Sequence, residues 1–276
     1  TKGDVTKQIW LQNAGFIWVP FIILSTLAAW FGMNDLASAK ASFKDQAVIF
    51  SRKHNWIMCI LYLGTFGSFI GFAAGFPLLI KSQFTGIDPV KYAFLGPLVG
   101  ALARPFGGWI SDKIKSGALI TQFVFIGMIV AVCGVIFFLP NNGEGGNFWG
   151  FFACFLALFT LTGIGNGSTF MQVPVIFLNM HQKFAEEGKV SEEQARLDAT
   201  KEGAAVIGFT AAFAAYGGFF IPKSYGTSID LTGGVNAALI GFIIFYAICA
   251  ALNWWYYTRK ALKPNADVRT LSTQAV

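Results

Sequence analysis

The chain has 276 residues, of which 55% are hydrophobic and only 12% are charged. Soluble domains carry about 25% charged residues, so this composition excludes an ordinary soluble globular protein. The mean hydropathy is +0.58, and several apolar runs approach the roughly 20 residues that a helix needs to cross a bilayer. The sequence therefore predicts an all-helical, polytopic membrane protein.

Seven apolar stretches, separated by polar or turn-forming residues, are predicted to be transmembrane helices. In chain order they are residues 13–32, 56–80, 92–110, 118–139, 148–178, 203–222 and 235–257. The fifth stretch is longer than a bilayer requires, so we expect it to tilt or to project from the membrane.

The lysines and arginines predict the orientation of these spans. Most of them fall on one side: Lys40, Lys44, Arg52, Lys53, Lys113, Lys115, Lys183, Lys189, Arg196, Lys201, Arg259, Lys260, Lys263 and Arg269. The other side holds only Lys2, Lys7, Lys81, Lys91 and Lys223. Because basic residues concentrate in cytoplasmic loops, the N-terminus is predicted outside and the C-terminus inside. Topology thus accounts for the net charge of +6, and no nucleic-acid partner is expected.

One basic residue, Arg104, lies inside the third predicted span. Every Asp and Glu falls in a predicted loop or at a span end, so no carboxylate of the spans is expected to neutralise it. An arginine at a helix centre costs about 2.5 to 3.5 kcal/mol and cannot shed its proton. Its planar fork suits a small planar oxyanion, which predicts an anion site. The alternative is that Arg104 reaches the cytoplasmic face or is satisfied by backbone carbonyls.

Glycines recur every fourth residue around Arg104, at Gly96, Gly100 and Gly108. Small residues at this spacing let helices approach closely, so we expect Arg104 to lie on a glycine ridge that faces another helix. Gly163 and Gly167 repeat the pattern in the fifth span.

Two aromatic residues of the second span are predicted to share the depth of Arg104. Tyr62 lies about 9 Å from the cytoplasmic end of its span and Arg104 about 10 Å from its own. Phe66 follows Tyr62 on the same helical face, about one turn deeper. A tyrosine hydroxyl can donate to an oxyanion and an aromatic wall can exclude water, although packing alone would also explain both residues.

Other chemistries find little support in the sequence. The four cysteines lie in apolar runs without a CxxC spacing, so no metal site is expected. His54 and His181 are predicted to be solvated or interfacial residues at cytoplasmic helix edges. With no carboxylate or histidine inside the spans, no proton relay is expected. No cofactor and no enzymatic activity are predicted.

Several stretches resemble the nitrate/nitrite porter family of the major facilitator superfamily, above all GALARPFGGWISDK, LYLGTFGSFIGFAAGF, LTGIGNGSTF and AAFAAYGGFFIPKSYG. The resemblance implies a twelve-helix fold, of which this chain would hold the sixth helix and the C-terminal six-helix half. Residues 1–55 would then form the sixth-helix equivalent and the central cytoplasmic loop, 56–258 the six-helix bundle and 259–276 a cytoplasmic tail.

The resemblance also implies roles for individual residues. Arg104 would clamp the anion together with a second arginine from the missing N-terminal half, and Tyr62, Phe66, Asn166 and Gly163 would line the site. The residues implied in conformational change or packing are Gly96, Gly100, Gly108, Asp112, Gly208, Gly217 and Gly218, with Gly108 and Asp112 in a cytoplasmic loop motif and the last three in a glycine-rich signature.

The function implied is secondary transport of nitrate and nitrite across the bacterial cytoplasmic (inner) membrane. Exchange is favoured over proton symport, because no titratable carboxylate is seen within the spans. Transport of another small anion and a non-transporting membrane module are the alternatives. Since alternating access needs two repeats around one site, the chain alone is expected to be inert.

Overall fold

The computed structural model describes residues 12–34, 42–140 and 145–262, and within these ranges all regular secondary structure is helical. The chain divides into two compact units, residues 1–42 and 43–276. Most of the predicted tail, 259–276, and the first eleven residues lie outside the described ranges.

The first unit contains α1 (Gln12–Phe16) and α2 (Val19–Gly32). Residues 13–32, predicted as one span, form two helices in the structure, because residues 17 and 18 lie in a turn between α1 and α2. Pro20 lies in the first turn of α2, where its missing N–H costs nothing but where a continuous helix would lose a hydrogen bond. With 14 residues, α2 is shorter than a membrane-spanning helix.

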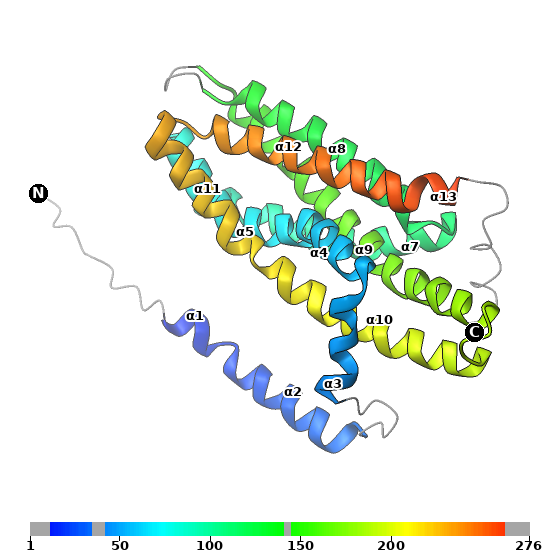
Figure 1. Cartoon of the computed structure of the whole chain (residues 1–276). Coiled ribbons are helices and arrows are strands. Elements are labelled where there is room, and N and C mark those ends of the chain that lie inside the picture. The colour runs from blue at the N-terminus through cyan, green and yellow to red at the C-terminus, as the bar shows by residue number, and fades with distance from the viewer. Residues whose placement is uncertain (1–11, 35–41, 141–144, 263–276) are drawn as a thin grey trace, which may run out of the picture. The chain divides into compact units, whose positions relative to one another are not determined.

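The second unit is a bundle of helices (Figure 1). In chain order it comprises α3 (Phe43–Gln46), η2 (Ala47–Ser51), α4 (Lys53–Tyr62), η3 (Leu63–Gly67), α5 (Ser68–Gln83), α6 (Pro89–Tyr92), α7 (Leu95–Ile114), α8 (Gly117–Phe138), α9 (Phe148–Glu186), α10 (Glu192–Ala215), α11 (Gly217–Thr232), α12 (Asn236–Asn253), η4 (Trp254–Thr258) and α13 (Arg259–Ala261). The side chains of Ser116, Asn147 and Ser191 cap the N-termini of α8, α9 and α10, respectively, as hydroxyl and amide side chains commonly do.

Five helical runs of the described residues are long and apolar enough to cross a membrane: Lys53–Gln83, Gly117–Phe138, Phe148–Glu186, Glu192–Thr232 and Asn236–Ala261. The protein is therefore a multi-pass membrane protein. Helix α7 is not among the five, since it carries Arg104 together with several glycines and prolines. The count of seven spans thus stays a prediction.

Helix α9 lies at the centre of the bundle and packs against α7, α8 and α10, while α11 packs on α5 and α12 on α8 (Figure 1). Aromatic side chains fill the space between α5 and α9, where the rings of Phe76 and Phe155 stack with centroids 4.4 Å apart. With 39 residues, α9 extends for about 58 Å. It therefore exceeds the thickness of a bilayer, in agreement with the length expected of the fifth span.

Candidate functional site: a lone arginine beside an aromatic and amide wall

Four of the predicted binding residues lie together, although they come from four different elements. The guanidinium carbon of Arg104, on α7, lies 5.7 Å from the centroid of the Phe66 ring, on η3. The Phe66 ring stacks on that of Tyr62, the last residue of α4, at 5.2 Å. The Tyr62 hydroxyl donates a hydrogen bond of 2.8 Å to Oδ1 of Asn166, on α9. The result is a cation above an aromatic wall, with an amide behind it.

Close contact between α7 and α9 brings Arg104 towards Asn166. A Cβ atom at Gly163 would overlap the carbonyl of Gly100, and one at Gly167 would overlap the carbonyl of Arg104. Side chains at these positions would force the helices apart, so glycine allows the backbones to touch. The structure therefore places Gly163 at a helix crossing.

The wall is built on a π-helical turn. Residues 63–67 form η3, which continues α4 into α5. Such turns insert an extra residue into a helix and occur frequently at functional sites. Here the turn begins directly after Tyr62 and contains Phe66, and it is buried at Gly64, Thr65 and Gly67.

Arg104 is solvent-exposed in this bundle. Within the described residues its guanidinium makes no ion pair and no hydrogen bond, to side chain or backbone. The guanidinium contacts the aromatic face of Phe66. A cation–π contact of this kind contributes about 0.5 to 1 kcal/mol at an exposed position. A guanidinium with five unused donors can bind an anion in a bidentate manner.

Arg104 was predicted to lie on the face of α7 that contacts another helix, but the structure places it beside that face. The buried positions of α7 are Gly96, Gly100, Ala103, Gly107 and Ser111. A row of every fourth residue drifts around a helix that has 3.6 residues per turn, so the contact stripe shifts by one residue after Gly100. Gly108 is accordingly half-buried.

The other predicted positions are dispersed over the bundle. Gly96 packs against the Phe159 ring, and Gly217 against the backbone of Gly67. A Cβ at Gly218 would lie 2.9 Å from Cγ2 of Ile70, whereas one at Gly208 would meet no neighbour within 4 Å. Asp112 is exposed, and in the described part of the chain it forms no ion pair.

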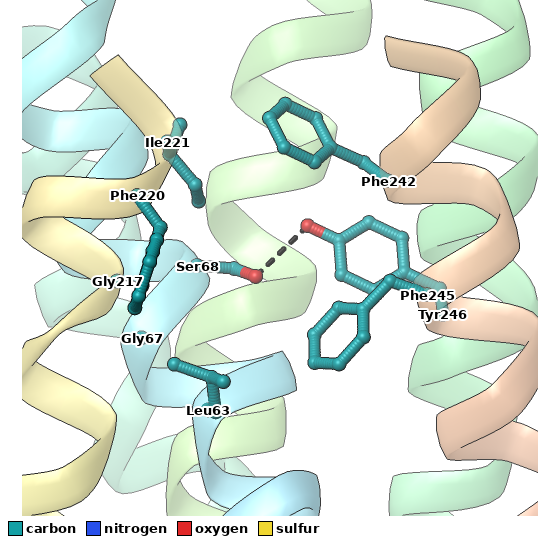
Figure 2. Close-up of a pocket in the computed structure, with 9 residues that line it drawn as sticks. All are labelled: Leu63, Gly67, Ser68, Gly217, Phe220, Ile221, Phe242, Phe245 and Tyr246. Carbon is teal, nitrogen blue, oxygen red and sulfur yellow. Dashed lines mark hydrogen bonds between the residues drawn. The ribbon is translucent and has the colours of Figure 1, made fainter. Parts of the chain in front are cut away.

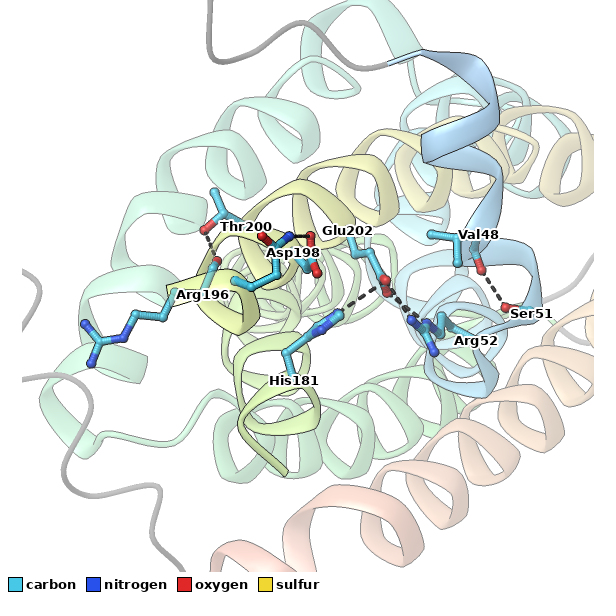
Figure 3. Close-up of polar contacts among 9 residues, drawn as sticks. Val48, Ser51, Arg52, His181, Arg196, Asp198, Thr200 and Glu202 are labelled. Atoms are coloured by element: carbon cyan, nitrogen blue, oxygen red, sulfur yellow. Dashed lines mark hydrogen bonds and ion pairs between the residues drawn. The ribbon is translucent and has the colours of Figure 1, made fainter. Parts of the chain in front are cut away.

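A buried ionic cluster, which the sequence did not predict, lies near the C-terminal end of α9 (Figure 3). It joins α9 to α10 and to the start of α4. Glu202 of α10 accepts hydrogen bonds from Nε and Nη2 of Arg52, at 2.9 and 2.7 Å. Nε2 of His181, on α9, lies 3.3 Å from Oε1 of the same carboxylate. The hydrogen bond to Glu202 raises the pKa of Arg52 above its ordinary value. Arg52 therefore remains charged at any physiological pH.

This cluster corrects two expectations. Glu202 is 8% exposed and His181 4% exposed, so His181 is not solvated, and a buried carboxylate and histidine do exist. The sequence placed Glu202 at the edge of an apolar run, and its partner Arg52 lies 150 positions away. A contact of that sequence separation leaves no local signal. By contrast, His54 is half-buried and bonds Tyr257 Oη at 3.0 Å, which agrees with an interfacial position.

A row of buried polar side chains runs from Asn166 along the same face of α9. Thr121 contacts Ser168 at 2.8 Å and Thr169 at 3.4 Å, and it accepts a 2.7 Å hydrogen bond from Nε2 of Gln172. The spacing of Asn166, Thr169 and Gln172 at every third residue could have revealed this polar face.

A pocket of about 200 Å³ lies between α5, α11 and α12 (Figure 2). Its lining comprises Leu63, Gly67, Ser68, Gly217, Phe220, Ile221, Phe242, Phe245 and Tyr246. The Tyr246 hydroxyl points across it and donates to Ser68 Oγ at 2.9 Å. With an apolar lining and no cation, this pocket offers nothing to an anion.

No protein-family model matches the chain, but several known proteins are similar to it. The chain is 45% identical to the nitrate/nitrite transporter NarU of Escherichia coli (strain K12), over 91% of this chain and 54% of the relative. It is 46% identical to NarU of Salmonella typhimurium, over 92% of this chain and 54% of the relative. The probable nitrate/nitrite antiporter NarK2 of Thermus thermophilus is 42% identical, over 95% of this chain and 55% of the relative.

The chain thus spans about half the length of the curated relatives that it matches. The level of identity extends over more than nine-tenths of its own residues and includes the helices that carry Arg104, Phe66, Tyr62 and Asn166. Along about half of their length, the chain is therefore a homologue of these nitrate/nitrite transporters.

Proposed function

We propose that this chain supplies one half of a transporter for nitrate and nitrite, in which Arg104 binds the anion. The proposal rests on Arg104, which lies on the glycine-rich helix α7, has no carboxylate partner in the described residues and has the Phe66 ring at 5.7 Å. An anion would complete the electrostatics of this guanidinium. The names of the relatives support nitrate and nitrite as that anion.

The neighbours of Arg104 suit a planar oxyanion. In the proposed site, the Phe66 ring forms an apolar wall that keeps water from the ion. Tyr62 is a positioning residue, because its hydroxyl occupies Oδ1 of Asn166 and so orients the amide N–H groups. Those N–H groups can then donate to an oxygen of the anion.

We propose further that the site is completed by a second bundle, from the same polypeptide or from another chain. Support comes from the exposure of Arg104 and from the share of the relatives that the chain covers. In this arrangement the chain has seven spans, in a half of a major facilitator fold, and its C-terminus is cytoplasmic. Two bundles rocking around a midplane site would give alternating access in the bacterial cytoplasmic membrane.

Nitrate/nitrite exchange and nitrate/proton symport are both compatible with these residues. The sequence favoured exchange because it showed no buried carboxylate or histidine, whereas the structure buries Glu202 and His181 side by side. Counterflow of labelled nitrate, with and without internal nitrite, separates the two modes. A stimulation by internal nitrite at equal pH indicates exchange, and uptake driven by a pH gradient without nitrite indicates symport.

The test of the site uses the chain together with its complementary bundle in proteoliposomes. We expect nitrate uptake that is lost in Arg104→Lys, because lysine retains the charge but not the bidentate fork. Arg196→Lys, at an exposed position of α10, is the matched control and should transport normally. Undiminished uptake by Arg104→Lys would contradict the proposed site. Uptake by the 276-residue chain alone would contradict the need for a second bundle.

A further inference from the structure

Four cations gather at one end of the bundle, away from the proposed anion site. Lys53 begins α4, Lys183 lies in the last turn of α9, and Arg259 and Lys260 lie in α13. Lys53, Lys183 and Arg259 all act electrostatically on Lys260. Lys53, Lys183 and Lys260 likewise act electrostatically on His54, whose ring lies 5.7 Å from that of Tyr257. We refer to Lys53, Lys183, Arg259 and Lys260 as the basic cluster.

Aromatic side chains accompany the basic cluster. Nζ of Lys53 lies 5.0 Å from the centroid of the Tyr256 ring, and Cζ of Arg259 lies 4.4 Å from that of Trp255. Trp254 and Trp255 are 47% and 60% exposed. Tryptophan and tyrosine rings of this kind settle at the level of the lipid headgroups, so the cluster lies where phosphates are found.

The cluster lacks a counter-charge. None of its four members pairs with a carboxylate in the described part of the chain, and all four are exposed. Lys183 and Lys260 also have no recorded aromatic or hydrogen-bonding partner there. Four cations that repel one another cost free energy, which an anion bound between them would recover.

We propose that the basic cluster binds the headgroup of an anionic phospholipid. A phosphodiester is the anion available at this depth, and the apolar outer face of α12, with Ile244 and Ile248 exposed, can receive its acyl chains. Each lysine or arginine near a membrane surface contributes about 1 kcal/mol to the binding of acidic lipid. The inference needs the chain to be in a membrane, but it does not depend on nitrate or nitrite as substrates.

The experiment measures lipid binding to the purified 276-residue chain by native mass spectrometry. Dioleoylphosphatidylglycerol is added to the delipidated protein, and dioleoylphosphatidylcholine is the zwitterionic comparison. The test variant is Lys183→Gln/Lys260→Gln. The matched control is Arg196→Gln/Lys201→Gln, which removes the same charge from exposed positions of α10. A third variant, Lys183→Arg/Lys260→Arg, retains the charge of the cluster.

We expect one phosphatidylglycerol to bind at least tenfold more tightly than phosphatidylcholine. The Gln variant of the cluster should lose about 10- to 30-fold in affinity, whereas the α10 control and the Arg variant should bind as the unmodified chain does. Equal binding by the Gln variant, or an equal loss in the α10 control, would overturn the proposal. Displacement of the lipid by millimolar inorganic phosphate at constant ionic strength would also overturn it, in favour of a site for a free anion.

Discussion

Glu202 accepts two hydrogen bonds from Arg52, at 2.9 and 2.7 Å, and this fork ties α10 to the start of α4. The carboxylate is almost fully buried, and the side chain of Arg52 is 24% exposed. Nε2 of His181 adds a third helix at 3.3 Å. One carboxylate of α10 therefore connects the start of α4 to the last turns of α9.

Replacing Arg52 with Gln should destabilise the bundle, because the buried Glu202 carboxylate loses its main partner. Removal of one partner from a buried pair costs about 3 to 5 kcal/mol, and the partial exposure of Arg52 puts the expected loss near 2 to 3 kcal/mol. In thermal unfolding this corresponds to roughly 4 to 12 °C.

The exposed pair of Lys189 and Glu187 offers the control for that measurement. Its side chains are 63% and 55% exposed, so Lys189→Gln should change stability by less than about 1 kcal/mol. If both variants melted at the same temperature, the Arg52–Glu202 pair would stabilise the bundle no more than the exposed pair does.

Arg104→Lys should weaken nitrate binding in the assembled transporter by about 10- to 100-fold. Charge-assisted hydrogen bonds contribute about 1.5 to 3 kcal/mol each, and lysine cannot offer two parallel donors. Titration of nitrate against the intrinsic tryptophan fluorescence, with Arg196→Lys as control, measures the change. A loss of less than twofold would show that the planar fork is not what recognises the anion.

Some features of this bundle follow from sequence alone, because they depend on local patterns. The predicted span 118–139 coincides with α8, which runs from Gly117 to Phe138. A largely apolar run between a serine cap and a proline leaves little choice of boundary. The grouping of Arg104 with Tyr62 and Phe66 was also predicted, because depth along a helix is set by its rise of 1.5 Å per residue.

Other features depended on contacts between distant parts of the chain. The predicted span 203–222 began at the apolar run, whereas the helix starts at Glu192, after the Ser191 cap. The polar first turns of α10 are stabilised by the cap and by the Arg52–Glu202 fork, and hydropathy detects neither. The ridge through Arg104 shifted for a different reason, since an exact spacing of four drifts relative to 3.6 residues per turn.

Tyr62→Phe should weaken nitrate binding by about five- to tenfold without affecting Arg104. The change removes one hydrogen bond, worth about 1 kcal/mol, and releases the side chain of Asn166. A double-mutant cycle with Asn166→Ala tests the positioning role. Once Tyr62 is Phe, Asn166→Ala should cost much less than it costs in the unmodified chain, because the two residues act as a unit. Additive losses would instead mean that Tyr62 and Asn166 contact the anion independently.

Gly163→Ala should disrupt the crossing of α7 and α9, even though only a methyl group is added. The new Cβ would overlap the carbonyl of Gly100 and lie 3.1 Å from Cβ of Ala103. Because both obstacles belong to the neighbouring helix and cannot rotate away, the helices must separate, at a cost of about 1 to 3 kcal/mol. The matched control is Gly208→Ala on α10, where a Cβ meets no neighbour within 4 Å and where alanine should raise stability slightly through its helix propensity. Apparent melting temperatures of the two variants in detergent should therefore move in opposite directions. A Gly163→Ala protein as stable as the unmodified chain would show that α7 and α9 do not touch through their backbones, and the position of Arg104 next to Asn166 would lose its structural basis.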